Sequence, residues 1–232
     1  MRQKNPRNPK RNLALKQAKN KDKQLKVECL VVGQLQTNCY LVWEKETHEG
    51  VIIDPGDDAE YILNRVKDLE IKPLFILATH GHFDHVLAVL ELKTALKIPF
   101  LVNKKDLFLL KRAVSSAKFF TGEKDALKPL VDKFIKENDI ISFGKKGDLK
   151  VIDSPGHSPG GVVFESRGVV FSGDTLFKQG MGTTQYSYCS QPDLLSSIKN
   201  KLFKLPDETI VYPGHGEETT IGEERQALGL LI

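Results

Sequence analysis

Short hydrophobic runs, turns and amphipathic segments follow one another from residue 25 almost to the end of the chain. Runs of about four to eight residues rich in Val, Ile, Leu and Phe, bounded by Gly, Pro, Asn or Asp, are typical of β-strands. Such runs predict strands at residues 25–32, 38–43, 50–54, 73–78, 98–102, 140–143, 149–153, 161–165, 169–172 and 209–212.

Apolar residues at helical spacing separate several of these strands. They predict helices over residues 57–69, 86–96 and 192–204, and helical segments within residues 103–135. Asp57 or Asp58 is expected near the N-cap of the first helix, and Thr121-Gly122 is expected to break the helical segments. Two successive strand-and-helix halves without a linker predict one α/β domain over residues 25–232.

Charge is concentrated at the N-terminus. Residues 1–24 hold nine Lys or Arg and one acid, a net charge of +8, whereas the whole chain carries +4. Residues 25–232 therefore carry −4, so the folded part is mildly acidic and no nucleic-acid partner is predicted. A basic segment with few apolar residues is expected to be a disordered tail. An organellar targeting peptide is the alternative.

Three cysteines, Cys29, Cys39 and Cys189, are odd in number and far apart. Such spacing does not predict a disulfide framework and favours a reducing compartment. No apolar run approaches the length of about 18 residues that a membrane span requires. A cytoplasmic protein without a membrane partner is expected, or an organellar one if the basic segment is a targeting peptide. The pattern leaves the oligomeric state open.

Five of the six histidines lie in three short segments, the first of which also holds Asp84, and Asp174 lies in a fourth segment between the last two. These segments supply the candidate metal ligands His80, His82, Asp84, His85, His157, Asp174 and His215. If Asp174 is shared, they offer about eight donors, which is enough for two cations. Imidazole and carboxylate without thiolate suit zinc first, with iron or manganese as alternatives. His48 lies in a polar turn and is expected to be a solvated residue outside this set.

The spacing divides the ligands between two ions. His80 and His82 are two residues apart on extended backbone, so both side chains leave the same face and can hold one ion. Gly81 between them keeps the loop free of side-chain bulk. Asp84 and His85 come where the chain turns into the next helix and are expected to reach a neighbouring ion. Asp174 is placed to bridge the two ions, and His215 to complete the second.

Four further segments resemble one known family: GQLQTNCYLV (33–42), DPG (54–56), SGDTLF (172–177) and PGHG (213–216). Together with the histidine segments they resemble the glyoxalase II-like hydrolases of the metallo-β-lactamase superfamily, and TTIGEE (219–224) resembles the short bacterial-type members. The resemblance implies a four-layer αβ/βα sandwich with a dinuclear site at one edge of its two sheets. It assigns metal 1 to His80, His82, His157 and Asp174, and metal 2 to Asp84, His85, Asp174 and His215. It also implies that Asp54 orients a ligand histidine.

The resemblance implies a hydrolase that cleaves a small-molecule thioester such as S-lactoylglutathione. Two ions lower the pKa of a bridging water, and the resulting hydroxide attacks the carbonyl. Asp84 is the candidate catalytic residue, because it can both ligate a metal and orient the hydroxide. Lys178, Tyr186 and Tyr188 follow Asp174 in a loop that is expected to flank the metals, and are candidate substrate contacts.

Two departures from the family concern glutathione recognition. Full-length glyoxalase II enzymes carry a helical C-terminal segment that helps to hold glutathione, and only seventeen residues follow His215 here. Thr183 occupies a position that is usually basic. A mononuclear iron persulfide dioxygenase and a lactonase or ester hydrolase are therefore alternatives. A class B β-lactamase is not expected, because the position of His85 and the lack of a secretory signal argue against it.

Overall fold

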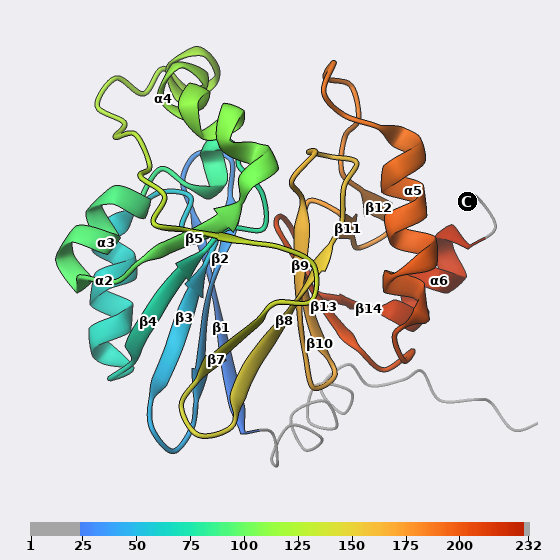
Figure 1. The fold of residues 1–232 in the computed structure, drawn as a ribbon, viewed down its shortest axis with the longest axis horizontal. Helices are drawn as coiled ribbons and strands as arrows, with labels where there is room; N and C mark the ends of the chain where they lie inside the picture. Colours follow the sequence, from blue (N-terminus) through green and yellow to red (C-terminus); the bar gives the residue numbers. More distant parts are fainter. Residues whose placement is uncertain (1–23, 230–232) are drawn as a thin grey trace, which may run out of the picture.

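Two six-stranded sheets form the centre of the structure, a computed structural model that describes residues 24–229 (Figure 1). The first sheet has the order β1 (Leu25–Val32), β2 (Thr37–Glu44), β3 (Glu49–Ile53), β4 (Lys72–Leu77), β5 (Phe100–Asn103), β6 (Lys133–Ile135). The second has the order β14 (Thr219–Thr220), β13 (Ile210–Pro213), β10 (Val169–Gly173), β9 (Val162–Ser166), β8 (Gly147–Asp153), β7 (Ile140–Phe143). A separate hairpin joins β11 (Leu176–Phe177) to β12 (Gly180–Met181).

Helices cover the outer face of each sheet (Figure 1). The first sheet packs against α2 (Ala59–Asp68), α3 (Val89–Leu96) and α4 (Leu107–Thr121). The second packs against α5 (Gln191–Asn200) and α6 (Ile221–Leu228). Strand pairing within each sheet is mixed: β3 to β6 pair in parallel, whereas β7 to β10 pair antiparallel. The layers confirm the predicted αβ/βα sandwich.

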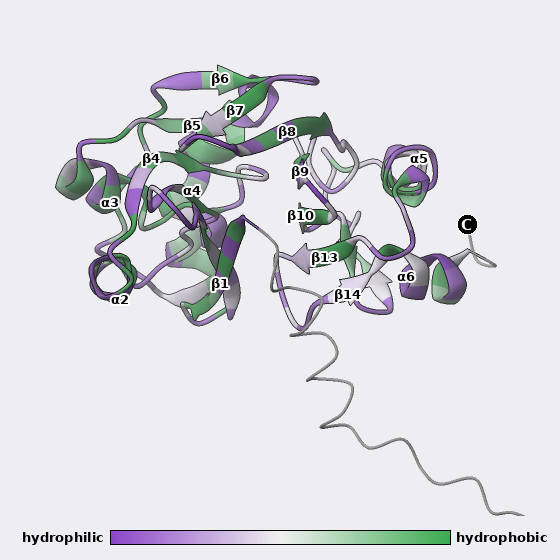
Figure 2. Ribbon diagram, turned by 90° about the horizontal axis from the view of Figure 1, so that it is seen from below, coloured by the Kyte–Doolittle hydropathy of each residue, from purple (hydrophilic) through white to green (hydrophobic). Residues whose placement is uncertain are grey.

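The main core lies between the two sheets. Val42 and Ile53 of the first sheet face Phe164 and Phe171 of the second, and all four are fully buried. Burial of a side chain of this size stabilises the fold by roughly 1.5–3 kcal/mol. Every residue of β2 except Trp43 is buried, because helices cover one face of this sheet and the second sheet covers the other. Figure 2 shows hydrophobic residues gathered on the central strands, whereas the helices also expose hydrophilic residues.

The helix predictions are correct in place but not in every boundary. Asp58 stands at the N-cap position of α2, but its carboxylate accepts a hydrogen bond from the Gly33 N–H at 2.8 Å and does not cap the helix. The helix predicted from residue 86 begins at Val89, because residues Phe83–His85 form a separate 3-10 turn. The helix predicted over 192–204 ends at Asn200, and a second 3-10 turn follows it.

Residues 103–135 hold one long helix where several helical segments were predicted. Helix α4 ends at Gly122, whose φ of 76° terminates the helix at the predicted break. The strand β6 within this segment was not predicted, nor were β11, β12, β14 and α6. The predicted disordered tail over residues 1–24 lies outside the described residues except for Gln24.

Candidate metal centre

The loops that follow four strands meet at one edge of the sandwich. His80 and His82 follow β4, His157 follows β8, Asp174 directly follows β10 and His215 follows β13. Such loops hold side chains in fixed positions because the hydrogen-bonded strands anchor them. All seven predicted ligands belong to three overlapping groups whose ligand atoms lie within 4.8 Å of one another.

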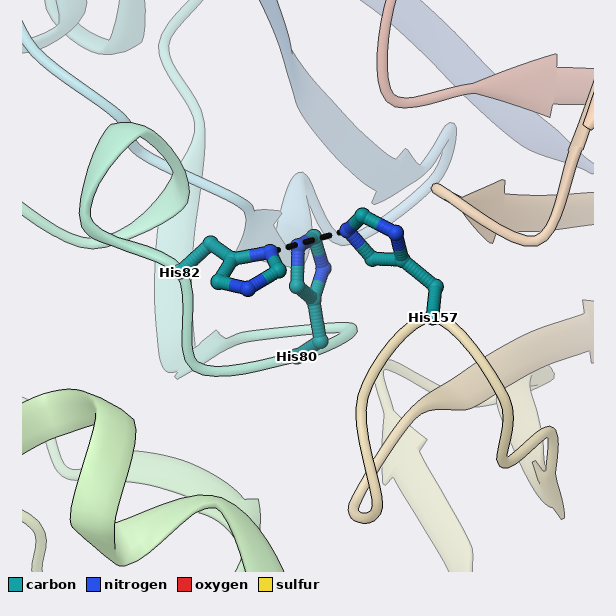
Figure 3. Close-up of side chains that lie close together, drawn as sticks. All are labelled: His80, His82 and His157. Atoms are coloured by element: carbon teal, nitrogen blue, oxygen red, sulfur yellow. Dashed lines mark hydrogen bonds between the residues drawn. The ribbon is translucent and has the colours of Figure 1, made fainter. Parts of the chain in front are cut away.

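The first group contains His80, His82 and His157, whose rings converge from two separate loops (Figure 3). The centroid of the His80 ring lies 4.7 Å from that of His82 and 5.0 Å from that of His157. Nδ1 of His82 lies 2.8 Å from Nε2 of His157. Three imidazoles that share one small space supply three of the four donors of a tetrahedral site.

A second group consists of Asp84, His85 and His215. Oδ2 of Asp84 lies 3.3 Å from Nε2 of His215 and 3.6 Å from Nε2 of His85. His85 is fully buried, whereas about a quarter of the His215 side chain, 28%, is exposed. This group therefore has one member inside the fold and one at the surface, with the carboxylate of Asp84 between them.

Asp174 lies between the two groups. Its Oδ2 is 3.4 Å from Nε2 of His157 in the first group and 3.8 Å from Nε2 of His215 in the second. Its Oδ1 is 3.4 Å from Nε2 of His85. The carboxylate thus approaches histidines of both groups, which is the position that a shared ligand requires.

Two of the predicted ligand histidines are held in orientation by backbone carbonyls. Nδ1 of His157 lies 2.8 Å from the carbonyl oxygen of Thr183, and Nδ1 of His215 lies 3.1 Å from that of Leu35. A carbonyl only accepts, so each Nδ1 carries the proton and each Nε2 presents its lone pair. The outer hydrogen bond of a ligand histidine fixes its tautomer and ring orientation in this way.

Asp54 connects two further histidines to the end of β3. Its carboxylate accepts hydrogen bonds from the Thr79 backbone N–H and hydroxyl, both at 2.7 Å, and Oδ2 lies 3.1 Å from Nδ1 of His85. The Thr79 hydroxyl is in turn 3.1 Å from Nδ1 of His80. Asp54 is therefore placed beside a predicted ligand, as the family resemblance implies.

Several buried polar atoms of these groups have no hydrogen-bond partner in residues 24–229. They include Nε2 of His80, Nε2 of His85 and Oδ1 of Asp174. A buried polar atom without a partner costs about 1–3 kcal/mol. A cation between the rings and carboxylates would satisfy all three atoms, so the residues fit bound metal ions.

Burial and neighbouring charges shift the pKa values of the clustered histidines in opposite directions. Burial lowers the pKa of His80 well below its usual value and that of His82 to about 3. Both are neutral at pH 7, which is the form that binds metal. Burial also disfavours the charged form of His85, but the neighbouring carboxylates, that of Asp84 first, raise its pKa to about 10. If His85 ligates a metal ion, as the sequence predicts, the ion would have to displace a proton.

Asp106 also belongs to this region but was not predicted. Its buried carboxylate accepts hydrogen bonds from the Gly81 N–H at 2.8 Å, the Ser158 hydroxyl at 2.7 Å and the Gly160 N–H at 2.6 Å. One carboxylate thus joins the loop of His80 and His82 to the loop of His157. Gly81 leaves room for it, because a Cβ there would lie 2.9 Å from Cβ of Asp106. An aspartate shortly after a buried strand was the available signal in the sequence.

A pocket of about 350 Å³ opens over the cluster. Its lining includes His82, Asp84 and Asp174, and the candidate substrate contacts Tyr186 and Tyr188. The rings of the two tyrosines stack with centroids 5.5 Å apart. The Tyr188 hydroxyl lies 2.9 Å from Nε2 of His82, so this residue contacts both the pocket and a predicted ligand.

Lys178 lies outside that pocket. It forms an ion pair with Glu217 on the exposed surface, and it lines two other pockets near α6 and β1. Nor does the loop thiol Cys189 line the pocket; its Sγ donates a hydrogen bond to the carbonyl oxygen of His157 at 3.0 Å. Lys178 thus does not line the pocket, whereas Tyr186 and Tyr188 do, and substrate contact by each of the three stays a prediction.

The model of the Metallo-beta-lactamase superfamily matches residues 32–215, which include every predicted ligand. The chain belongs to this superfamily. Hydroxyacylglutathione hydrolase GloC of Haemophilus influenzae is 34% identical over 214 residues, with 88% of this chain and 96% of the relative covered. The fold and the resemblance predicted from the sequence are both confirmed.

Two solved structures align with most of the chain. The B3 metallo-β-lactamase BLEG-1 has a TM-score of 0.80 at 36% identity and covers 87% of this chain and 97% of its own. TTHA1623 in a di-iron-bound form has a TM-score of 0.78 at 39% identity, with 87% and 98% covered. The superfamily and these relatives point to metallo-hydrolase activity. In residues 24–229 no helix has the length and apolar character needed to cross a membrane.

Proposed function

We propose that this protein is a dinuclear metal-dependent hydrolase of thioesters, with glutathione thioesters such as S-lactoylglutathione as its substrates. The observation that carries the proposal is the position of Asp174 between two groups of histidines, within 3.8 Å of both. The substrate class is supported by the relative GloC, whose name is that of a hydroxyacylglutathione hydrolase.

Each ion would have four protein ligands. Metal 1 is assigned to His80, His82, His157 and Asp174, and metal 2 to Asp84, His85, Asp174 and His215. Zinc suits this donor set first, and iron is supported by the di-iron form of TTHA1623. When bound, two divalent ions supply a nucleophile at neutral pH and polarise the carbonyl of the scissile bond.

The protein's own groups would bind and orient the reactants. Burial raises the pKa of Asp84, but the histidines, His85 first, hold that pKa well below its usual range. Asp84 is therefore ionised at neutral pH, and it lines the pocket, where it can accept a hydrogen bond from an attacking nucleophile. The Thr37 hydroxyl donates to its Oδ2 at 3.3 Å and restricts its rotation. The Tyr188 hydroxyl, 2.9 Å from Nε2 of His82, would restrict the rotation of that ring.

β-Lactam hydrolysis is the second candidate, and the similarity to BLEG-1 favours it. A β-lactam and a thioester both present an activated acyl group to the same nucleophile, so one metal centre can serve both reactions. The two substrates differ in shape and in leaving group, and the pocket wall would decide between them.

The test is a substrate panel with metal-loaded, full-length protein. It contains S-lactoylglutathione, an aryl ester, a lactone and a cephalosporin, and oxygen uptake is followed separately with glutathione persulfide. We expect the highest kcat/KM for S-lactoylglutathione, by at least about tenfold, since a hydrogen-bonded site discriminates by 1.5–3 kcal/mol for each charged contact. The control is His48→Ala, which alters the histidine outside the cluster and should change none of these rates. A highest rate on the cephalosporin, or oxygen uptake without thioester cleavage, would overturn the proposal.

A further inference from the structure

One face of α4 forms a wall of the pocket above the metal cluster. Leu109, Arg112, Ser116 and Phe120 all line this pocket. Their spacing of three, four and four residues places them on the same side of the helix. Three of the four are apolar or small, so Arg112 brings a positive charge to an otherwise uncharged wall.

Both ends of this helical face are anchored to the segment that carries four of the predicted ligands. At one end, a Cβ on Gly81 would lie 3.1 Å from Cβ of Leu109. At the other, the ring of Phe120 stacks on that of Phe83, with centroids 5.7 Å apart and planes within 4°. Arg112 lies between these anchors, three residues or about 4.5 Å along the helix from Leu109. Its guanidinium is therefore held over the same pocket as the metal ligands.

The guanidinium of Arg112 is supported by aromatic rings and leaves its hydrogen-bond donors free. Cζ lies 5.9 Å from the centroid of the Phe108 ring, which meets the ring of Tyr188 edge-on at 5.3 Å. Across residues 24–229, Arg112 has no carboxylate within ion-pair distance and its side chain donates no hydrogen bond. An arginine in this setting has a planar pair of N–H groups available for a ligand.

The charges around the pocket favour an anion at Arg112. The acids that line it are Asp84 and Asp174, and both belong to the proposed metal ligands. Their charge would be taken up by the ions, which leaves Arg112 as the cation that faces substrate. Thr183, which replaces the family's usual basic residue, also lines the pocket and leaves a charged contact to be made from elsewhere.

We infer that Arg112 binds a carboxylate of the substrate, so that the enzyme selects anionic thioesters, with the carboxylate on α4 and the thioester carbonyl at the metal cluster. Leu109, Phe83 and Phe120 would contact the apolar part of the molecule between these two points. The inference rests on the proposed function and adds the residue that recognises the substrate. Carboxylate is preferred because the two parallel N–H groups of a guanidinium match its two oxygens.

The test compares Arg112→Gln with Lys111→Gln, which removes the adjacent exposed charge of the same helix outside the pocket. Metal-loaded full-length proteins are assayed on S-lactoylglutathione and on its dialkyl ester, in which both carboxylates are masked. Arg112→Gln should raise KM for S-lactoylglutathione about tenfold and change kcat by less than about threefold, because the lost contact is uniform binding. The unaltered protein, Arg112→Gln and Lys111→Gln should all turn over the dialkyl ester at the same rate. Arg112→Lys should recover part of the lost affinity.

Calorimetry with S-hexylglutathione, a thioether that cannot be hydrolysed, measures binding without turnover. We expect Arg112→Gln to weaken binding about tenfold and Lys111→Gln to leave it unchanged, in line with the loss of one exposed charge-assisted contact. Unchanged binding and KM in Arg112→Gln, an equal loss in Lys111→Gln, or no binding to the unaltered protein would overturn the inference. Binding that depends on Arg112 without any thioester turnover would overturn the proposed function and leave the carboxylate site standing.

Discussion

Replacement of Asp174 by alanine is expected to lower the metal content to one ion or fewer per chain and thioester turnover by more than about a hundredfold. Removal of a residue that hydrogen-bonds to a metal ligand already lowers metal affinity or activity by about ten- to a hundredfold. Loss of a ligand that both ions share should lower them further. Two divalent ions in such a site lie roughly 3.5–4 Å apart and repel one another, and the carboxylate between them offsets that repulsion. Elemental analysis and steady-state kinetics on the same preparation measure both effects.

The matched control is Asp148→Ala, which removes an exposed aspartate on β8 that lies 3.7 Å from Arg167. An exposed ion pair of this kind contributes about 0–1 kcal/mol, so metal content and turnover should stay at the level of the unaltered protein. Two tightly bound ions in Asp174→Ala would show that Asp174 does not bridge them.

Asp106→Ala is expected to lower the free energy of unfolding by about 2–4 kcal/mol. It should also weaken metal binding at the group of His80, His82 and His157 about ten- to a hundredfold. Three hydrogen bonds to the carboxylate would be lost, and two of their donors are backbone N–H groups that would remain buried without a partner. The affinity falls because the carboxylate holds the two ligand loops together, as an outer partner does in other metal sites. Denaturant unfolding of the metal-free protein and chelator competition measure the two effects separately.

Ser158→Ala provides a graded comparison, since it removes one of the three hydrogen bonds at Asp106 and no ligand. Its loss of unfolding free energy should be about 1 kcal/mol. If Asp106→Ala destabilises the protein but binds metal as tightly as the unaltered chain, Asp106 stabilises the fold without positioning the ligands.

The convergence of the candidate ligands could be predicted because their signals are local. Each candidate stands next to a buried strand, and the backbone at a strand end fixes where its side chain points. The order of residues from His80 to His85 predicts a division between two ions. The structure groups His80 with His82 and Asp84 with His85, and it also groups His80 with His85 and Asp174.

Contacts between segments that are far apart in the sequence could not be predicted from such local patterns. Asp106 reaches Gly160 over 54 residues, and Tyr188 reaches His82 over 106. Neither pair shares a repeat or a spacing, because each is made by packing of separate loops. The short strands β11, β12 and β14 were missed for a related reason, since two residues are too few to show an alternation of polar and apolar positions.

The pocket wall formed by α4 could not be predicted from local patterns either. Its sequence indicates helical segments, and Gly122 marks their end. Polar residues on one helical face ordinarily predict a solvated surface. Here that face carries Arg112 and Ser116 and lines the pocket, and only the placement of α4 over the histidine segment reveals it. The substrate wall thus depends on tertiary packing, whereas the metal ligands depend on strand ends.

The number of metal ions per chain tests the central claim most directly. Full-length protein purified without chelator is analysed for zinc, iron and manganese, and the amount of protein is measured by amino-acid analysis of the same sample. Two groups of histidines that share Asp174 predict two ions per chain, and gradual removal of the ions should reduce thioester turnover in step. A single ion at full occupancy would contradict the dinuclear centre, and a single iron without thioester turnover would favour the mononuclear iron dioxygenase.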